Sequence, residues 1–363
     1  MNVPKVTYFL GANSPDGFYS LYSELIPVEQ ASHIYIIKGG AGCGKSTLMR
    51  QVASQLEAQG ETVEYICCSG DPDSLDAVVF PNLGAAMVDG TAPHVVEPKY
   101  PGLVEEYVNL GKTYNREGLQ TIRETILSCM QGYQEHYQRA YRCLNAAAEI
   151  LMDMRSMVLT TELKQKLQKR GKGIGAKELK DKKTGETGTV RQRFLDAITH
   201  KGPIVCWDTV FAQCPRIYEL VDGYGLAHEV LSEFLADGLK KGYSLVACPD
   251  PMFPEQVKHL LIPELGLAFV TTQNKGEDGL ESYRTIYLDH MIDAELLAQN
   301  KARLKFARKV SGALVEEAVV SLVQAKEMHD GLEKNYNPFV DFSMVSTVAD
   351  RIVGELLHQE AKN

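Results

Sequence analysis

The sequence lacks the long apolar segments and the leader pattern that would link it to a membrane or to secretion. No apolar run approaches the roughly 20 residues that a membrane span requires, and Met1–Leu10 has no signal-peptide pattern. The eight cysteines include no C-x-x-C pair, and adjacent Cys67 and Cys68 are more typical of buried thiols than of metal ligands. We therefore expect a cytoplasmic protein without a membrane association.

An excess of positive charge is also missing. The 363 residues contain 38 Lys and Arg against 47 Asp and Glu, which gives a net charge of −9. This balance argues against broad binding of nucleic acid or of anionic membranes, and we expect neither as a partner. The hydrophobic share of 44% and the length are typical of a globular protein of two or three domains.

A glycine-rich segment follows a short apolar run near the N-terminus. Ile34–Ile37 favours a strand, Gly39–Ser46 fits G-x-x-x-x-G-K-[ST], and apolar residues at helical spacing follow. Backbone N–H groups of such a loop surround phosphate oxygens, and a lysine and a hydroxyl reach the phosphates and Mg²⁺. The sequence predicts a nucleotide-binding loop formed by Gly39, Gly40, Ala41, Gly42, Cys43, Gly44, Lys45, Ser46 and Thr47.

Carboxylates that could complete this site occur in two places. The apolar run Ala85–Val88 ends in Asp89, the form of a strand whose carboxylate holds Mg²⁺ together with Ser46. Asp71 and Asp73 follow a predicted strand at 61–68, where α/β sheets bind ligands, and they are candidates for turnover. A turn-capping role is their structural alternative. Asp76 and His94 are further candidates for orienting water, with structural roles as their alternatives.

Two later segments differ in pattern from this α/β part. Apolar residues at three- and four-residue steps predict helices over 103–159, and their stripe is typical of a helix-pair seam. Residues 160–193 are rich in glycine and in lysine, and Lys183 is one of these lysines. We interpret them as a linker or a mobile surface loop, with a basic arm over phosphate or over a partner as the alternative.

The second half of the chain repeats the first. At an offset of 183, Ile217-Tyr218 aligns with Ile34-Tyr35 and Gly225 with Gly42, and further matches continue through later turns and helices. We expect two P-loop-NTPase-like parallel-sheet lobes from an internal duplication, each with a helical appendage. The expected boundaries are 1–159 for the first lobe, with its helical extension at 103–159, 160–193 for the linker, and 194–363 for the second lobe, with its sheet at 194–290 and its helices at 291–363.

The second copy has lost the phosphate-binding residues. His228 replaces Lys45, and Glu229 replaces Ser46. Asp222 and Thr271 stand where the first copy has Gly39 and Asp89. The negative charges of Asp222 and Glu229 oppose phosphate, so we expect this lobe to be degenerate and to bind no nucleotide.

These motifs also carry a family resemblance. GGAGCGKST and AAMVD resemble the P-loop NTPase superfamily. Nearly the whole chain is similar to a family of bacterial tandem P-loop ATPases through GANSPDGF, KGGAGCGKST, CSGDPDSLD, FPNL and DGTAPH. The chain departs from that family at AHEV (227–230), where a second GKST would be expected. The resemblance implies ATP binding and hydrolysis, and it names no further substrate.

We therefore expect a Mg²⁺-dependent ATPase whose catalytic candidates are Lys45, Asp89, Asp71 and Asp73. GTP is the alternative nucleotide. One alternative is a P-loop kinase that uses Asp71 or Asp73 as the base toward an acceptor hydroxyl. The other is a nucleotide-gated switch with little turnover, in which the helical arms or the degenerate lobe bind a protein partner.

Overall fold

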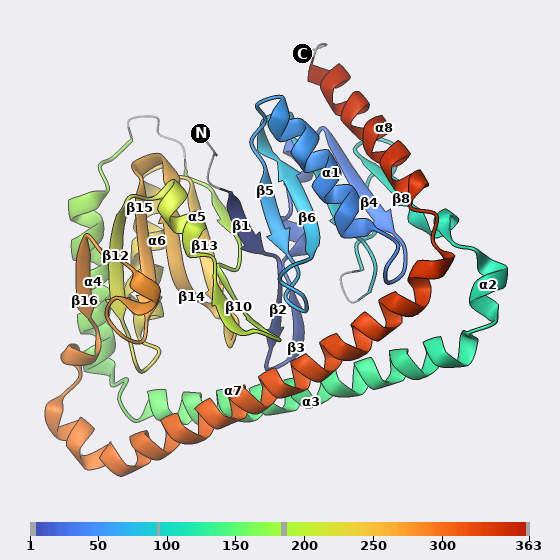
Figure 1. Cartoon of the computed structure of the whole chain (residues 1–363). Helices are drawn as coiled ribbons and strands as arrows, with labels where there is room; N and C mark the ends of the chain where they lie inside the picture. Colours follow the sequence, from blue (N-terminus) through green and yellow to red (C-terminus); the bar gives the residue numbers. More distant parts are fainter. Residues whose placement is uncertain (1–4, 93–94, 183–186, 361–363) are drawn as a thin grey trace.

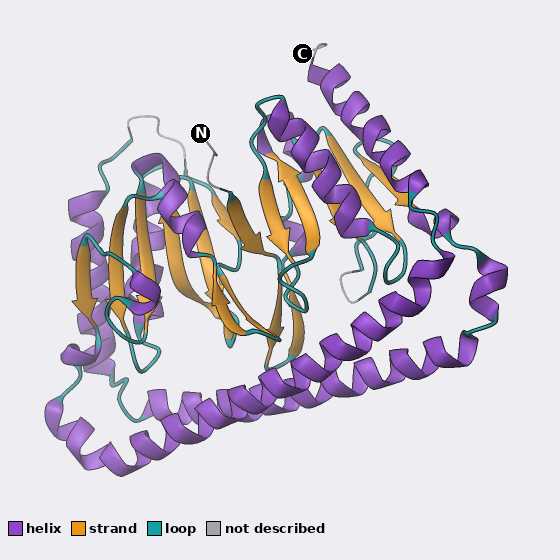
Figure 2. Cartoon of the chain, in the orientation of Figure 1, coloured by secondary structure: helices purple, strands orange, loops and turns teal. Residues whose placement is uncertain are grey.

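The computed structural model describes residues 5–92, 95–182 and 187–360, so that His94 and Lys183 lie outside the described residues. The chain forms two α/β lobes, each built on a six-stranded sheet with helices. The two sheets stand side by side above a pair of long helices, and this pair runs the length of the molecule (Figures 1 and 2). The expectation of a two-lobe α/β fold is confirmed at this level.

The sheet of the first lobe contains the strand that precedes the glycine-rich loop. Its strand order is β1-β5-β6-β7-β4-β8. The bounds are β1 (Val6–Phe9), β5 (Glu64–Cys67), β6 (Leu75–Phe80), β7 (Ala85–Asp89), β4 (His33–Lys38) and β8 (Glu105–Asn109). Helix α1 (Lys45–Ala58) follows β4. Because β4 and β7 are buried on both faces, both read as continuous apolar runs in the sequence.

The sheet of the second lobe has the same order of corresponding strands, β9-β13-β14-β15-β12-β16. The bounds are β9 (Val190–Gln192), β13 (Leu245–Asp250), β14 (Phe253–Ile262), β15 (Leu267–Thr272), β12 (Arg216–Val221) and β16 (Arg284–Tyr287). Helix α6 (Ala227–Lys240) follows β12 as α1 follows β4, and α5 (Trp207–Gln213) precedes β12.

The expected parallel sheets are confirmed only in part, because each sheet is mostly parallel but contains one antiparallel strand. Strands β6 and β14 each run antiparallel to both of their neighbours. The segments that connect β5 to β6 and β13 to β14 are much shorter than the dozen or more residues that a parallel crossover requires. Strand β6 was not among the expected strands, because Asp71, Asp73 and Asp76 before and at its start are typical of a turn.

Matching turns occupy matching places in the two lobes. The hairpin of β2 (Gly11–Ser14) and β3 (Gly17–Ser20) corresponds to that of β10 (Asp196–Thr199) and β11 (Gly202–Val205). Gly17 and Gly202 have φ of 106° and 92°. In both turns a hydroxyl, of Ser14 or Thr199, donates to the carbonyl of that glycine. The two halves thus agree in local backbone conformation as well as in strand order.

The helical appendages are exchanged between the lobes, which differs from the expected domain boundaries. After α2 (Arg116–Gln120), α3 (Arg123–Ser156) leaves the first lobe, and α4 (Thr161–Glu178) packs on α6 of the second lobe. In return, α7 (Ala294–Tyr336) leaves the second lobe, and α8 (Ser343–Glu360) packs on α1 of the first lobe (Figure 1). The expected helical stretch at 103–159 also contains strand β8 at its start. Each lobe is therefore completed by the other half of the chain.

The expectation of a linker or mobile loop at 160–193 is wrong for 161–178, which form α4. Thr160 caps this helix by accepting from the N–H of Leu163 at 3.1 Å. A Cβ at Gly171 would lie 2.3 Å from the carbonyl oxygen of Val230 on α6. Gly171, one of the glycines that suggested a loop, therefore allows the two helices to approach each other closely.

The apolar stripe of α3 is a helix-pair seam, as expected. Ala140 and Leu144 of α3 are buried against Ala318 and Leu322 of α7. Cross-contacts such as that between the Tyr133 and His329 rings show that the two helices run antiparallel. Among the described residues, no helix has both the length and the apolar character needed to cross a membrane.

A second junction joins the two sheets. Phe9 and Phe194 exchange backbone hydrogen bonds of 2.9 Å in both directions. Fully buried Arg193 donates to Glu64 at 2.7 Å. Burial alone would raise the pKa of Glu64, but the guanidinium groups of Arg193 and Arg191 lower it. The two lobes therefore share one apolar core as well as the exchanged helices.

Candidate functional site

The glycine-rich loop lies at the carboxyl end of β4 and leads into the N-terminus of α1. Gly42 and Gly44 have φ of 67° and 87°, a region that favours glycine. A Cβ at Gly39 would lie 2.5 Å from the sulfur of Cys43. Burial raises the pKa of the Cys43 thiol, so this side chain packs beneath the loop as a neutral group. The glycines of the motif are thus required by the shape of the loop.

The Lys45 ammonium lies between the loop and a carboxylate of the next strand. It donates to the carbonyl oxygens of Gly39 and Gly40 at 2.9 and 2.8 Å. Its distance to Asp89 Oδ2 is 3.5 Å. Because β4 and β7 are parallel neighbours in which Ile37 pairs with Asp89, their carboxyl ends lie at the same edge of the sheet. The structure thus brings together Lys45 and Asp89, two of the residues that the sequence selected.

Ser46 faces another part of the same edge. Its hydroxyl oxygen accepts from the backbone N–H of Leu75 at 3.0 Å, which connects the start of α1 to the start of β6. The oxygen keeps a further lone pair for another partner. Ser46 and Asp89 were expected to lie close together. The strands that lead to them, β4 and β7, are neighbours in the sheet, but among the described residues these two side chains make no direct contact.

Asp71 and Asp73 lie in the turn that precedes β6, where they are held by residues of the second half. Asp71 Oδ1 accepts from the N–H of Asp73 at 3.3 Å, a bond that fits the turn-capping alternative. The carboxylate of Asp71 lies 3.4 Å from the Lys326 ammonium, and that of Asp73 lies 2.6 Å from Lys201. Their contribution to turnover stays a prediction. Buried Asp76 accepts from the Tyr22 hydroxyl at 2.8 Å, which fits its structural alternative.

The exchanged helices α7 and α8 reach the loop from the other half of the chain. A Cβ at Gly42 would lie 3.2 Å from the carbonyl oxygen of Glu333, and one at Gly44 would lie 3.2 Å from Val345. With its amide oriented to satisfy its neighbours, Asn337 donates to the Gly42 carbonyl at 3.2 Å. The nucleotide-loop candidate is therefore covered by residues about 300 positions later in the sequence.

The corresponding loop of the second lobe holds one of its own carboxylates. Asp222 accepts from the N–H groups of Tyr224, Leu226 and Ala227 at 3.0, 2.6 and 2.7 Å. These positions match Ala41, Cys43 and Gly44 of the first loop at the offset of 183. Asp289 accepts from the N–H of Gly223 at 2.9 Å. This loop shape therefore directs several backbone N–H groups at an anion.

The residue that replaces Ser46 is also neutralised within the fold. Glu229 lies 3.0 Å from Arg155 and 3.4 Å from Lys164, both supplied by the exchanged helices α3 and α4. His228, which replaces Lys45, accepts from the N–H of Val257 at 3.0 Å. The charges that we expected to oppose phosphate are thus compensated by neighbouring groups of the chain.

Sequence reasoning missed several residues around the first loop. Thr91 donates through its hydroxyl to the Gly39 carbonyl at 2.9 Å and through its N–H to Asp89 at 2.8 Å. Its position two residues after Asp89 could have suggested this role. The Tyr114 hydroxyl donates to the Ala41 carbonyl at 3.2 Å. Nothing in the sequence indicated Tyr114 or Asn337, because their contacts depend on how the chain returns to this edge.

The first half of the chain is similar to one known family. The sequence profile of the family described as Nephrocystin 3, N-terminal, matches residues 20–172. This range begins in the first hairpin, includes the glycine-rich loop and the β7 carboxylate, and ends within α4. No curated protein sequence and no solved structure matches the chain.

Proposed function

We propose that the first lobe is a P-loop ATPase that binds Mg²⁺-ATP at Gly39–Thr47 and hydrolyses its β–γ phosphate bond. The observation that carries this proposal is the position of Lys45, 3.5 Å from Asp89 and bonded to two loop carbonyls at the carboxyl edge of parallel strands. The second lobe adds support, because its equivalent loop already binds a carboxylate through three backbone N–H groups. The two lobes would derive from a duplication in which the second copy lost its site.

The residues present fit the proposed ligand. Loop N–H groups and the Lys45 ammonium would hold the phosphates, while the Ser46 hydroxyl and the Asp89 carboxylate are hard oxygen donors suited to Mg²⁺. When bound, Mg²⁺ would neutralise charge that develops on the phosphate oxygens. Lys45 would exchange its bonds to Gly39 and Gly40 for phosphate oxygens, and Thr91 would keep Asp89 oriented through its N–H.

The test is phosphate release in matched variants of the two loops. Wild-type protein should release phosphate from ATP only with Mg²⁺, and Lys45→Ala should abolish the release. His228→Ala changes the corresponding position of the second loop and should leave the rate unchanged. Parallel assays with GTP show which of the two nucleotides is hydrolysed. Equal rates for wild type and Lys45→Ala would refute the assignment.

A second candidate, the nucleotide-gated switch, is favoured by the cover over the loop. Because Glu333, Asn337 and Val345 lie against the loop glycines, a nucleotide that moves the loop would also move the junction of α7 and α8. Hydrogen exchange over 333–345 should then change when ATP binds. Single-turnover hydrolysis that is much slower than nucleotide release would favour the switch, and a protein partner would then bind the helical arms or the second lobe.

A further inference from the structure

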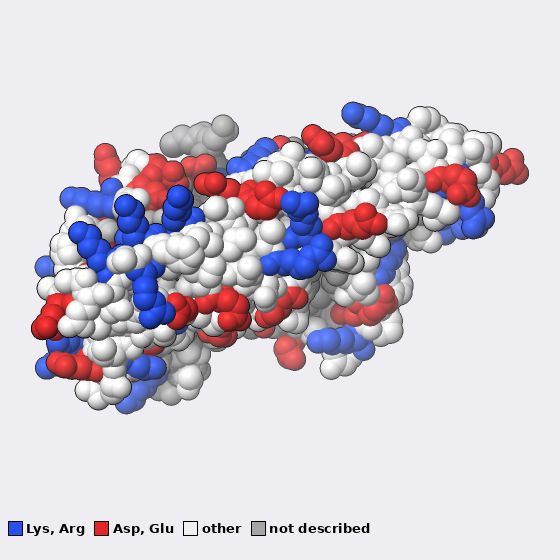
Figure 3. Space-filling view, turned by 90° about the horizontal axis from the view of Figure 1, so that it is seen from below, with Lys and Arg blue, Asp and Glu red and all other residues white. Residues whose placement is uncertain are grey.

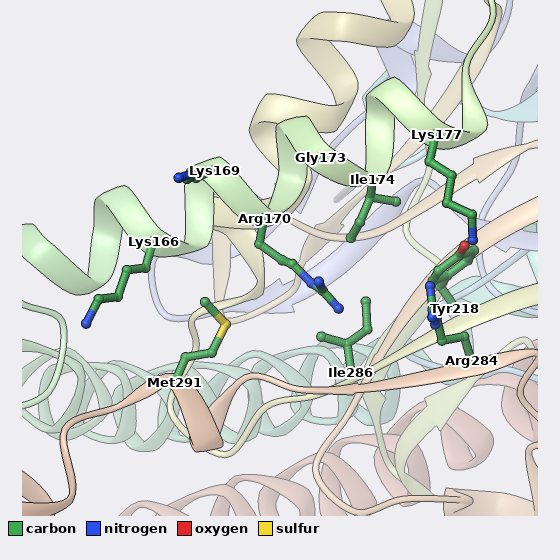
Figure 4. A pocket seen from close by; sticks show the side chains of 10 residues that line it. All are labelled: Lys166, Lys169, Arg170, Gly173, Ile174, Lys177, Tyr218, Arg284, Ile286 and Met291. Atoms are coloured by element: carbon green, nitrogen blue, oxygen red, sulfur yellow. The ribbon is translucent and has the colours of Figure 1, made fainter.

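The outer side of the second lobe has a groove lined by cations, between α4 and the edge strand β16 (Figure 4). Its volume is about 560 Å³, within the range of roughly 300–1,000 Å³ that is usual for small-molecule sites. Its apolar lining consists of Ile174 on α4 together with Ile286, Met291 and the ring of Tyr218. None of the residues that line it is acidic, and five carry positive charge: Lys166, Lys169, Arg170, Lys177 and Arg284.

The charge of this groove is unusual for the chain. The net charge of the whole protein is −9, and Lys, Arg, Asp and Glu are interspersed on the face seen from below (Figure 3). Figure 4 shows Arg170 and Lys177 extending from α4 toward Ile286 and Tyr218 on the sheet. A concave surface that is lined only by positive charges concentrates the local electric field and attracts anions.

The first lobe provides an internal comparison, because α8 packs on its sheet as α4 packs on the second sheet. At an offset of 182, Leu163, Leu167 and Ile174 of α4 match Val345, Ala349 and Leu356 of α8, and all six are buried. Across the strands, Tyr218 pairs with Arg284 just as Tyr35 pairs with Glu106. The two grooves can therefore be compared residue by residue.

In the first lobe the positive charge at the corresponding position is neutralised by carboxylates of the chain itself. Arg351 of α8 lies 3.2 Å from Glu106 and 2.8 Å from Glu355, and the Tyr35 hydroxyl donates to Glu355 at 2.9 Å. Buried Ile352 follows Arg351 on the helix. One cation thus has two carboxylate partners.

In the second lobe the positions of the two carboxylates carry the opposite charge or none. Lys169 replaces Arg351, Arg284 replaces Glu106, and Gly173 replaces Glu355. Arg170 stands in place of Ile352. No carboxylate stands at these positions, and the number of cations has risen, although Glu178 accepts from the Tyr218 hydroxyl at 2.6 Å as Glu355 does from Tyr35.

The carboxylates nearby compensate only part of this charge. Glu162 lies 3.2 Å from Lys166 on the exposed side of α4. Glu178 lies 3.5 Å from Lys177, but it also pairs with Arg216 at 2.6 Å. Within the described part of the chain, Lys169, Arg170 and Arg284 have no carboxylate within 4.0 Å. These three cations are available to an external anion.

We propose that this groove binds a small organic anion that carries at least two phosphate groups. A single carboxylate could not neutralise three or more cations, so a ligand with several negative charges is expected. The planar guanidinium groups of Arg170 and Arg284 are suited to binding phosphate oxygens. Lys166 and Lys177 are eleven residues apart, about 16 Å along the helix, so the charges are spread over more than one phosphate. The apolar part of the ligand would lie on Ile286 and Met291. The site is separate from the loop at 39–47.

The test uses inorganic tripolyphosphate in isothermal titration calorimetry at low ionic strength. Full-length Lys45→Ala protein in EDTA serves as the background, so that the result does not depend on the proposed ATP site. Tripolyphosphate should bind, and Arg170→Ala or Arg284→Ala should each weaken binding about tenfold, the loss of roughly one charge-assisted hydrogen bond. Lys172→Ala is the matched control. It removes a cation from the same helix, where Lys172 pairs with Glu233 outside the groove, and it should change the affinity less than twofold.

A second variant copies the first-lobe network into the second lobe. Gly173→Glu together with Arg284→Glu would give Lys169 the two carboxylates that Arg351 has. A Cβ at Gly173 meets no atom within 4 Å, so the fold should tolerate the change, which melting temperature would verify. Binding should be lost in this variant. Absence of tripolyphosphate binding to the background protein, or equal affinities of Arg170→Ala and Lys172→Ala, would overturn the proposal. Tighter binding of hexaglutamate than of tripolyphosphate would also overturn it, in favour of an acidic peptide.

Discussion

Replacing Lys45 by Met should separate nucleotide binding from stability. The Lys45 ammonium makes two hydrogen bonds to loop carbonyls and faces Asp89. Hydrogen bonds to charged groups contribute about 1.5–3 kcal/mol. The loss of one strong phosphate contact of about 2.7 kcal/mol corresponds to roughly 100-fold weaker binding of Mg²⁺-ATP.

The fold should tolerate this substitution, because most of the groups left behind keep a partner. Without the ammonium, the Gly39 carbonyl still accepts from the Thr91 hydroxyl at 2.9 Å. Asp89 still accepts from the Thr91 N–H at 2.8 Å. With two hydrogen bonds from a charged donor lost at about 1.5–3 kcal/mol each, the free energy of unfolding should fall by at most about 3–6 kcal/mol.

Lys38→Met is the matched control for this prediction. Lys38, at the end of β4, also donates to two backbone carbonyls, those of Gly90 and Val96, both at 2.9 Å, and it pairs with Glu97 at 2.7 Å. It should lose a similar amount of stability without losing ATP affinity. Calorimetry and urea unfolding of both variants measure the two effects. Near-equal ATP affinity of wild type and Lys45→Met would show that the loop is not the phosphate site.

Three further predictions concern carboxylates. Asp89→Asn should reduce Mg²⁺-dependent ATP binding and hydrolysis more than metal-free binding. A wild-type rate of hydrolysis in this variant would indicate that Asp71 or Asp73 binds the metal instead. Alanine at Asp71 or Asp73 should lower the rate of phosphate release, whereas a lowered melting temperature with unchanged specific activity would leave only their turn-capping role. Burial would raise the pKa of Asp196, but the Lys258 ammonium, 2.5 Å away, holds it at about 2. Its unfolded pKa is about 3.9, so roughly 2–3 kcal/mol of stability should be present above about pH 4 and should be lost as the pH falls toward 2. Urea unfolding across this range should show the loss in wild type, and Asp196→Asn should remove that part of the pH dependence.

The sequence by itself determined the local features of the protein. The glycine-rich loop between β4 and α1 was predictable because its spacing reflects backbone conformations within a few residues, including the positive φ of Gly42 and Gly44. The β7 strand ending in Asp89 was predictable from a short buried run. The repeat of the first half was visible because equivalent strands and turns retain equivalent residue types at an offset that changes by only a few residues along the chain.

Tertiary structure alone decided which parts meet. The glycines and lysines of 160–193 resembled a linker, and only the tertiary structure shows that 161–178 form a helix that approaches Val230 of α6 closely at Gly171. The exchange of α4 and α8 between lobes depends on the direction in which α3 and α7 leave their sheets, which no local pattern encodes. For the same reason Asn337 could not be assigned to the loop, although it reaches Gly42. Local preference fixes the conformation of short segments, whereas contacts between distant segments depend on the packing of the whole chain.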